Sequence, residues 1–177
     1  MSVVPVSADN GDHQTITISG AGNSSSVTTR TTTPLNPSCV ILVTRISTTT
    51  YTGLISTNSP GHSVFNGVAN TCVSPNPPGP GLAVTTLSDV TVSCGSGSPT
   101  CPAGFSRTGN LVLQSAFSTT GLASDPTGAN SETQITVLSG SGQLQGITGR
   151  GVSVVHATTT TSFSTYWIEL TFADSGE

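Results

Sequence analysis

The chain has 177 residues, the length of one ordinary domain, and it carries four arginines, no lysine and eight acidic residues, for a formal net charge of -4. So few basic groups exclude a nucleic-acid-binding face, and the lack of lysine excludes a P-loop and a Schiff-base enzyme. Only 7% of the residues are charged, serine and threonine are abundant, and the hydrophobic residues are rich in valine and isoleucine. This composition is typical of an all-β protein, and no run approaches the ~18 apolar residues of a membrane span.

The first part of the chain consists of short segments with strand composition. Residues 14–19 and 27–33 are rich in β-branched side chains, and the Gly-Ala-Gly-Asn sequence at residues 20–23 predicts a turn between them. Residues 39–47 form the most apolar segment, which is short for a helix and favours a strand buried on both faces. This strand is expected to continue to Ile55.

Further segments with strand composition follow at residues 62–69, 82–93, 109–117, 133–138, 152–156 and 163–172. In the last of them, alternation places Tyr166, Ile168, Leu170 and Phe172 on one face and Trp167, Glu169 and Thr171 on the other. The proline-rich residues 74–81 and the polar stretch around Asp125 predict loops.

About eight strands and no helix therefore emerge, which suits a closed barrel or a sandwich. We predict a single antiparallel β-barrel over residues 13–173, preceded by a polar lead at residues 1–12. The barrel is expected to be closed, so that no edge strand is left exposed.

A glycine-rich stretch at residues 139–151 lies between two β-branched runs and contains five glycines. Glycine at such points supplies positive φ or lets strands approach closely, so the stretch predicts a strand pair joined by tight turns. Its Gly140-x-Gly142-x-x-x-Gly146 spacing also occurs in dinucleotide-binding turns. Those turns require a following helix, whereas valines and threonines follow here, so no nucleotide site is expected.

The four cysteines, Cys39, Cys72, Cys94 and Cys101, lack Cys-x-x-Cys or nearby histidine spacing, which favours disulfides over a metal site. Cys94 and Cys101 flank a short loop and are the predicted pair, with Cys39 and Cys72 as the remaining pair; four buried thiols are the alternative. The N-terminus lacks the features of an export signal. Cysteines, low charge and the sequon beginning at Asn23, which acts only in a eukaryote, nevertheless predict a secreted or extracytoplasmic protein.

Several motifs occur in a characteristic order: Thr50-Tyr51-Thr52-Gly53, Phe65-Asn66-Gly67, Gly109-Asn110-Leu111-Val112-Leu113-Gln114, and the glycine stretch at residues 139–151. Over residues 40–172 this succession resembles DUF3224, a family of small bacterial domains of unknown function. That family is similar to the allene oxide cyclase and dirigent barrels, which are eight-stranded and antiparallel with an apolar lumen. The loops at residues 74–81 and 94–101 depart from the pattern, and the lumen acid of the plant cyclases has no match here. No catalytic residue is therefore carried over.

The resemblance implies a cofactor-independent cyclase or isomerase that holds a small hydrophobic, natural-product-like substrate in the lumen. The alternative is a non-catalytic secreted barrel that binds such a molecule or is structural.

The candidate polar groups of such a lumen are Glu132, Tyr51, Arg45 and Tyr166. A carboxyl in an apolar lumen would have a raised pKa and act as acid or base, arginine would orient a carbonyl, and tyrosine would donate a hydrogen bond. The plainer alternatives are an outward carboxylate, a salt bridge at the rim and core tyrosines.

No metal or other cofactor is expected. His13, His62 and His156 share no ligand spacing, and no Gly-x-Ser-x-Gly motif of a hydrolase is present. The repeated threonines lack the regular period of an ice-binding face, so we expect them at outward strand positions.

Overall fold

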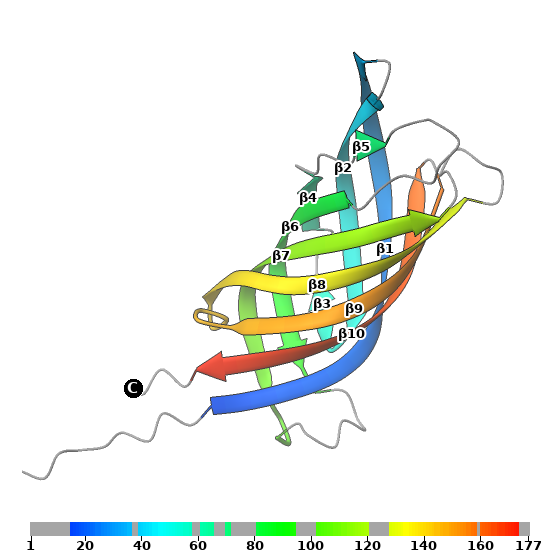
Figure 1. The fold of residues 1–177 in the computed structure, drawn as a ribbon. Coiled ribbons are helices and arrows are strands. Elements are labelled where there is room, and N and C mark those ends of the chain that lie inside the picture. Colours follow the sequence, from blue (N-terminus) through cyan, green and yellow to red (C-terminus); the bar gives the residue numbers. More distant parts are fainter. Residues whose placement is uncertain are drawn as a thin grey trace, which may run out of the picture.

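The computed structural model describes residues 15–36, 39–57, 61–65, 70–71, 81–94, 102–120, 128–158 and 160–173, which form ten strands and no helix (Figure 1). The strands are β1 (Thr15–Asn36), β2 (Cys39–Gly53), β3 (Ile55–Thr57), β4 (Gly61–Phe65), β5 (Asn70–Thr71), β6 (Gly81–Ser93), β7 (Ser106–Thr120), β8 (Ala129–Gly142), β9 (Thr148–Ala157) and β10 (Thr161–Ala173). The predicted all-β class is confirmed. The loop predicted around Asp125, and almost all of those predicted at residues 74–81 and 94–101, lie outside the described residues.

The strands form one antiparallel sheet in the order β3, β6, β7, β8, β9, β10, β1, β2 and β4, with β5 paired to β2. At the two ends of this order, β4 contacts β6 and β3 contacts β2. The sheet therefore curls round until its ends meet and is nearly closed into a barrel (Figure 1). This arrangement confirms the predicted antiparallel barrel.

β1 runs without interruption and pairs with β10 over its first part and with β2 over its second. The turn predicted at residues 20–23 is therefore wrong. Gly20 lies under the side chain of Leu54, and Gly22 lies under the ring of Tyr166. These glycines make room for large side chains inside the barrel and do not reverse the chain.

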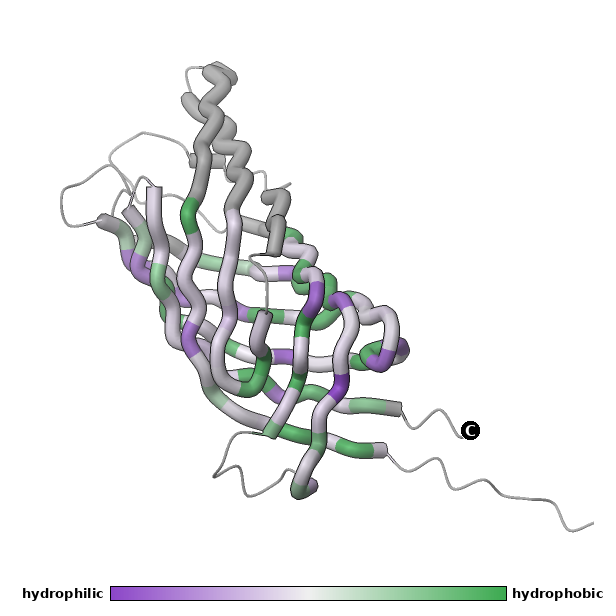
Figure 2. The backbone as a smooth tube through the Cα atoms, turned by 180° about the vertical axis from the view of Figure 1, so that it is seen from behind, coloured by the Kyte–Doolittle hydropathy of each residue, from purple (hydrophilic) through white to green (hydrophobic). Residues whose placement is uncertain are grey.

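The hydrophobic core fills the end of the barrel where β1 begins and β10 ends. Ile18 and Leu170 are paired across these two strands, and both are fully buried. The alternation predicted for the last strand is confirmed, because Tyr166, Ile168, Leu170 and Phe172 are buried while Trp167 is exposed. Figure 2 shows the same alternation of hydrophobic and hydrophilic positions along several strands.

The glycine stretch forms a hairpin, as predicted, with β8 and β9 joined by a turn at residues 143–146. Gly142 and Gly146 have φ values of 64° and 75°, which only glycine adopts readily. The turn folds toward the interior, and Leu144 and Ile147 are 0% and 2% exposed within the core. The hairpin therefore closes the apolar end of the barrel with its own side chains.

Candidate functional site

The inward-facing side chains change character along the barrel, from apolar at the closed end to hydroxyl-bearing beyond Tyr166. Ser24 of β1 pairs with Tyr51 of β2 and Ser164 of β10, and the hydroxyls of Ser24 and Ser164 are hydrogen-bonded. Serine and threonine side chains continue this inner wall, which consists of Ser24, Ser26, Thr49, Ser131, Thr133, Ser153, Ser162 and Ser164. All four serines of β1 and β10 are half-buried, whereas the core residues below them are fully buried.

Tyr51 and Tyr166 lie together at the boundary between the apolar core and the hydroxyl wall. Their ring centroids are 5.5 Å apart and the rings are tilted by 58°. The Tyr166 hydroxyl lies 2.8 Å from the Thr52 carbonyl oxygen and 3.0 Å from that of Ile55, and it accepts a hydrogen bond of 3.1 Å from the Ile55 N–H. The Tyr166 hydroxyl thus connects β10 to the end of β2 and the start of β3. This role is structural.

The Tyr51 hydroxyl differs from that of Tyr166, because among the described residues nothing is hydrogen-bonded to it. Its ring packs against the core, and β2 places it opposite Ser24 on the hydroxyl wall. Of the four predicted site residues, the structure therefore brings Tyr51 and Tyr166 together, and Tyr51 retains a hydroxyl that is able to bind another molecule.

Both tyrosines are expected to titrate well above their ordinary pKa. Burial, with a smaller contribution from Tyr166, raises the pKa of Tyr51 to about 12; burial also raises the pKa of Tyr166 to about 12, although the hydrogen bond with Ile55 opposes this. Because the ordinary value is 10.0, the folded state holds these protons more tightly than the unfolded state. Their contribution to stability is complete below pH 10 and is lost as the pH rises toward 12.

The chain contains two tyrosines, so the ultraviolet absorbance of tyrosinate reports on this pair alone. We expect a midpoint near pH 12 in the folded protein and near pH 10 in denaturant. A folded protein that titrates near pH 10 would contradict the buried arrangement.

Glu132 and Arg45 do not join this pair in the described structure. Glu132 is exposed on the outer face of β8, opposite Val154 of β9, so its carboxyl does not line the interior. A carboxylate gains nothing from burial, so an exposed position is the usual one for a residue such as Glu132. Arg45 lies opposite Arg30 and Phe65 in the strand ladders, and its side chain lies outside the described part of the chain.

The other charged side chains that the structure describes also lie outside. Asp89 is exposed at a bulge in β6, where its N–H donates to Asn110. Arg150 and Glu169 form an exposed ion pair of 3.8 Å, and Arg107 stacks over the Phe105 ring with 5.1 Å to its centroid. Exposed pairs of this kind contribute little to stability. The described interior of the barrel therefore contains no charged side chain.

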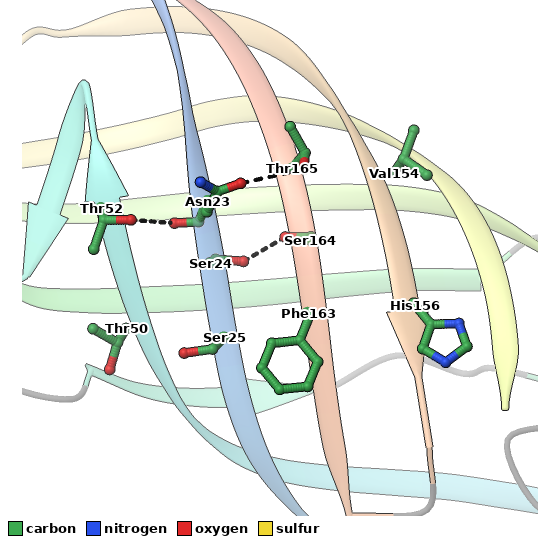
Figure 3. Close-up of a pocket in the computed structure, with 10 residues that line it drawn as sticks. All are labelled: Asn23, Ser24, Ser25, Thr50, Thr52, Val154, His156, Phe163, Ser164 and Thr165. Carbon is green, nitrogen blue, oxygen red and sulfur yellow. Dashed lines mark hydrogen bonds between the residues drawn. The ribbon is translucent and has the colours of Figure 1, made fainter.

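A second feature is an open groove of about 410 Å³ on the outer face (Figure 3). It crosses four neighbouring strands, β2, β1, β10 and β9. Its lining combines amide, hydroxyl, imidazole and apolar groups, from Asn23, Ser24, Ser25, Thr50, Thr52, Val154, His156, Phe163, Ser164 and Thr165.

Neither the hydroxyl wall nor the groove was predicted from the sequence. The alternation of the last strand, extended backwards from Tyr166, places Ser164 and Ser162 on the same inward face. This part of the wall could therefore have been predicted from the sequence. Their partners on β1, Ser24 and Ser26, could not have been predicted, because the turn expected at residues 20–23 interrupts the alternation of that strand.

Other predicted features remain predictions. Cys72 and Cys101 lie outside the described residues, and so does the side chain of Cys39; Cys94 is half-buried against the core. Within the described ranges, no three His, Cys, Asp or Glu side chains gather as metal ligands. No helix in the same part of the chain is long and apolar enough to cross a bilayer.

No family model, curated protein or solved structure matches the chain. The resemblance to DUF3224 and the allene oxide cyclase-like barrels therefore stays a prediction.

Proposed function

We propose that this protein is a binding barrel that holds a small uncharged molecule against the hydroxyl wall, with Tyr51 as its principal hydrogen-bond donor. The observation that carries this proposal is the Tyr51 hydroxyl, which has no hydrogen-bond partner among the described residues and lies beside half-buried serines. The packed core lies on one side of Tyr51, and β1, β2 and β10 continue beyond it on the other.

The chemistry of the wall defines the ligand. Hydroxyl groups both donate and accept hydrogen bonds, and the described inward side chains at this level carry no charge. Val155 and the ring of Tyr51 add apolar surface. A small hydrophobic molecule that carries a few hydroxyl or carbonyl groups fits such a wall better than one without polar groups.

A cofactor-independent cyclase or isomerase is the second candidate, and Tyr51 favours it in one respect. A phenol with a pKa of about 12 stays protonated at neutral pH, so it would polarise a carbonyl of a reacting molecule by donating a hydrogen bond. It would not serve as a base, because efficient proton transfer needs a pKa near the working pH. With Glu132 outside, the described interior offers no carboxyl for that task, which supports binding over catalysis.

Binding is tested by calorimetry with a panel of terpenoid, fatty-acid and polyketide compounds that carry hydroxyl or carbonyl groups. We expect at least one compound to bind, and we expect Tyr51→Phe to weaken it about fivefold to tenfold, the effect of one hydrogen bond. Product analysis of the same mixtures reports cyclisation or isomerisation.

The control is Thr136→Val, which removes an exposed hydroxyl from the outer face of β8 and should leave the affinity unchanged. If no compound binds, or if Tyr51→Phe binds as tightly as the original protein, the proposal fails.

An extracytoplasmic location and an allene oxide cyclase-like family are further parts of the proposal. The location is supported by four cysteines in a chain of low charge. The Cys94–Cys101 and Cys39–Cys72 disulfides are part of the same proposal, because disulfides persist in oxidising compartments. The family is supported by the barrel architecture alone.

A further inference from the structure

We propose that the groove on the outer face of β1, β2, β9 and β10 binds a neutral saccharide, with the ring of Phe163 as its stacking platform. The outward side chains of the groove, Phe163 and Val154 among them, lie on the face of the sheet away from Tyr51, and Ser24 and Ser164 are the two residues that the groove shares with the hydroxyl wall (Figure 3). The inference therefore does not depend on what the barrel interior binds.

One side of the groove is apolar and unusually exposed. Phe163 on β10 is 62% exposed and Val154 on β9 is 63% exposed. Both side chains point away from the barrel interior, so packing in the hydrophobic core does not account for them. Exposed apolar groups gathered beside polar ones mark ligand-binding grooves and interaction sites.

The other side of the groove offers uncharged hydrogen-bonding groups in fixed positions. The Asn23 side-chain oxygen accepts a hydrogen bond of 3.2 Å from the Thr165 hydroxyl, and the Asn23 carbonyl accepts one of 3.2 Å from Thr52. The Thr165 contact orients the Asn23 side-chain amide, whose nitrogen lies on the side away from Thr165 (Figure 3). His156 is held by a 2.9 Å contact between Nδ1 and the side-chain oxygen of Asn130.

This combination matches the chemistry of a pyranose ring. One face of the sugar consists of C–H groups, which carry partial positive charge and stack on the electron-rich face of an aromatic ring. Its edge carries hydroxyls, which pair with amide, hydroxyl and imidazole groups. Among the described residues, no acidic or arginine side chain lines the groove, so this part of it offers a charged ligand no counter-charge.

The single tryptophan provides the readout. Trp167 is 44% exposed on the same face of β10 as Phe163, four residues away along the strand. A saccharide bound across the groove is therefore expected to change its fluorescence. The probes are maltohexaose, cellohexaose, xylohexaose, mannohexaose and chitohexaose, with oligogalacturonate as the charged comparison.

At least one neutral probe is expected to change Trp167 fluorescence saturably, while oligogalacturonate does not. Phe163→Ala is expected to weaken that binding at least about tenfold, and Phe163→Leu to do the same because it keeps apolar area but removes the ring. Leu138→Ala, which removes an exposed apolar side chain of β8 outside the groove, should bind normally. Tyr51→Phe should also bind normally, which separates this site from the barrel interior.

Three results would overturn the inference. The first is that no neutral probe binds. The second is that Phe163→Leu retains full affinity, because apolar contact rather than ring stacking would then explain the site. The third is a concentration-dependent dimer in sedimentation velocity that Phe163→Ala abolishes, because the groove would then be covered by a second copy of the chain.

Discussion

Replacement of Gly22 by alanine is expected to lower the free energy of unfolding by at least about 3 kcal/mol, a large part of the ~5–15 kcal/mol of an ordinary domain. Gly22 lies in β1 opposite Gly53 of β2 and Tyr166 of β10. A methyl group here would collide with the backbone oxygen of Thr52 and with the Tyr166 hydroxyl. The Thr52 oxygen belongs to the main chain of a paired strand, so it cannot give way without disturbing the ladder between β1 and β2.

The effect is measured by chemical denaturation, with Ala21→Gly as the matched control. Ala21 is the neighbouring residue and is exposed on the outer face, so loss of its methyl group should cost at most about 1 kcal/mol. Gly22→Ala folding with full stability would contradict the close approach of β10 and β2 over this glycine.

Replacement of Tyr166 by phenylalanine is expected to lower the free energy of unfolding by about 2 kcal/mol and the melting temperature by about 6 °C. The ring would stay in the core, but the hydroxyl that accepts from the Ile55 N–H and donates to a backbone carbonyl would be gone. Ile55 is 1% exposed, so its N–H would be left without water as a substitute partner. The main cost is this unpaired buried group.

Tyr51→Phe is the control for Tyr166→Phe, since it removes the same atom from the neighbouring ring. No hydrogen bond within the described residues involves the Tyr51 hydroxyl, so its loss should change the free energy of unfolding by less than about 0.5 kcal/mol. Thermal melts of the two variants give the comparison. Equal destabilisation would show that Tyr51 is as structural as Tyr166 and would weaken its role in binding.

The sequence by itself determined the all-β class, the segments at β6, β7, β8, β9 and β10, and which face of β10 is buried. These features are local. Side chains alternate between the two faces of a strand with a period of two, so the sequence of residues 163–172 already separates Tyr166 and Ile168 from Trp167. Gly142 and Gly146 likewise mark the hairpin turn, because its backbone conformation favours glycine wherever the rest of the chain lies.

Only the tertiary structure decided what lies opposite each residue. Gly20 and Gly22 look like turn residues locally, but they are strand residues because Leu54 and Tyr166 lie over them. The sequence does not distinguish the roles of the two tyrosines. In the described structure they differ because the Tyr166 hydroxyl is hydrogen-bonded to the backbone of Ile55 and the Tyr51 hydroxyl is not. The hydroxyl wall and the outer groove join residues more than a hundred positions apart, and strand register, which depends on packing across the whole barrel, brings them together.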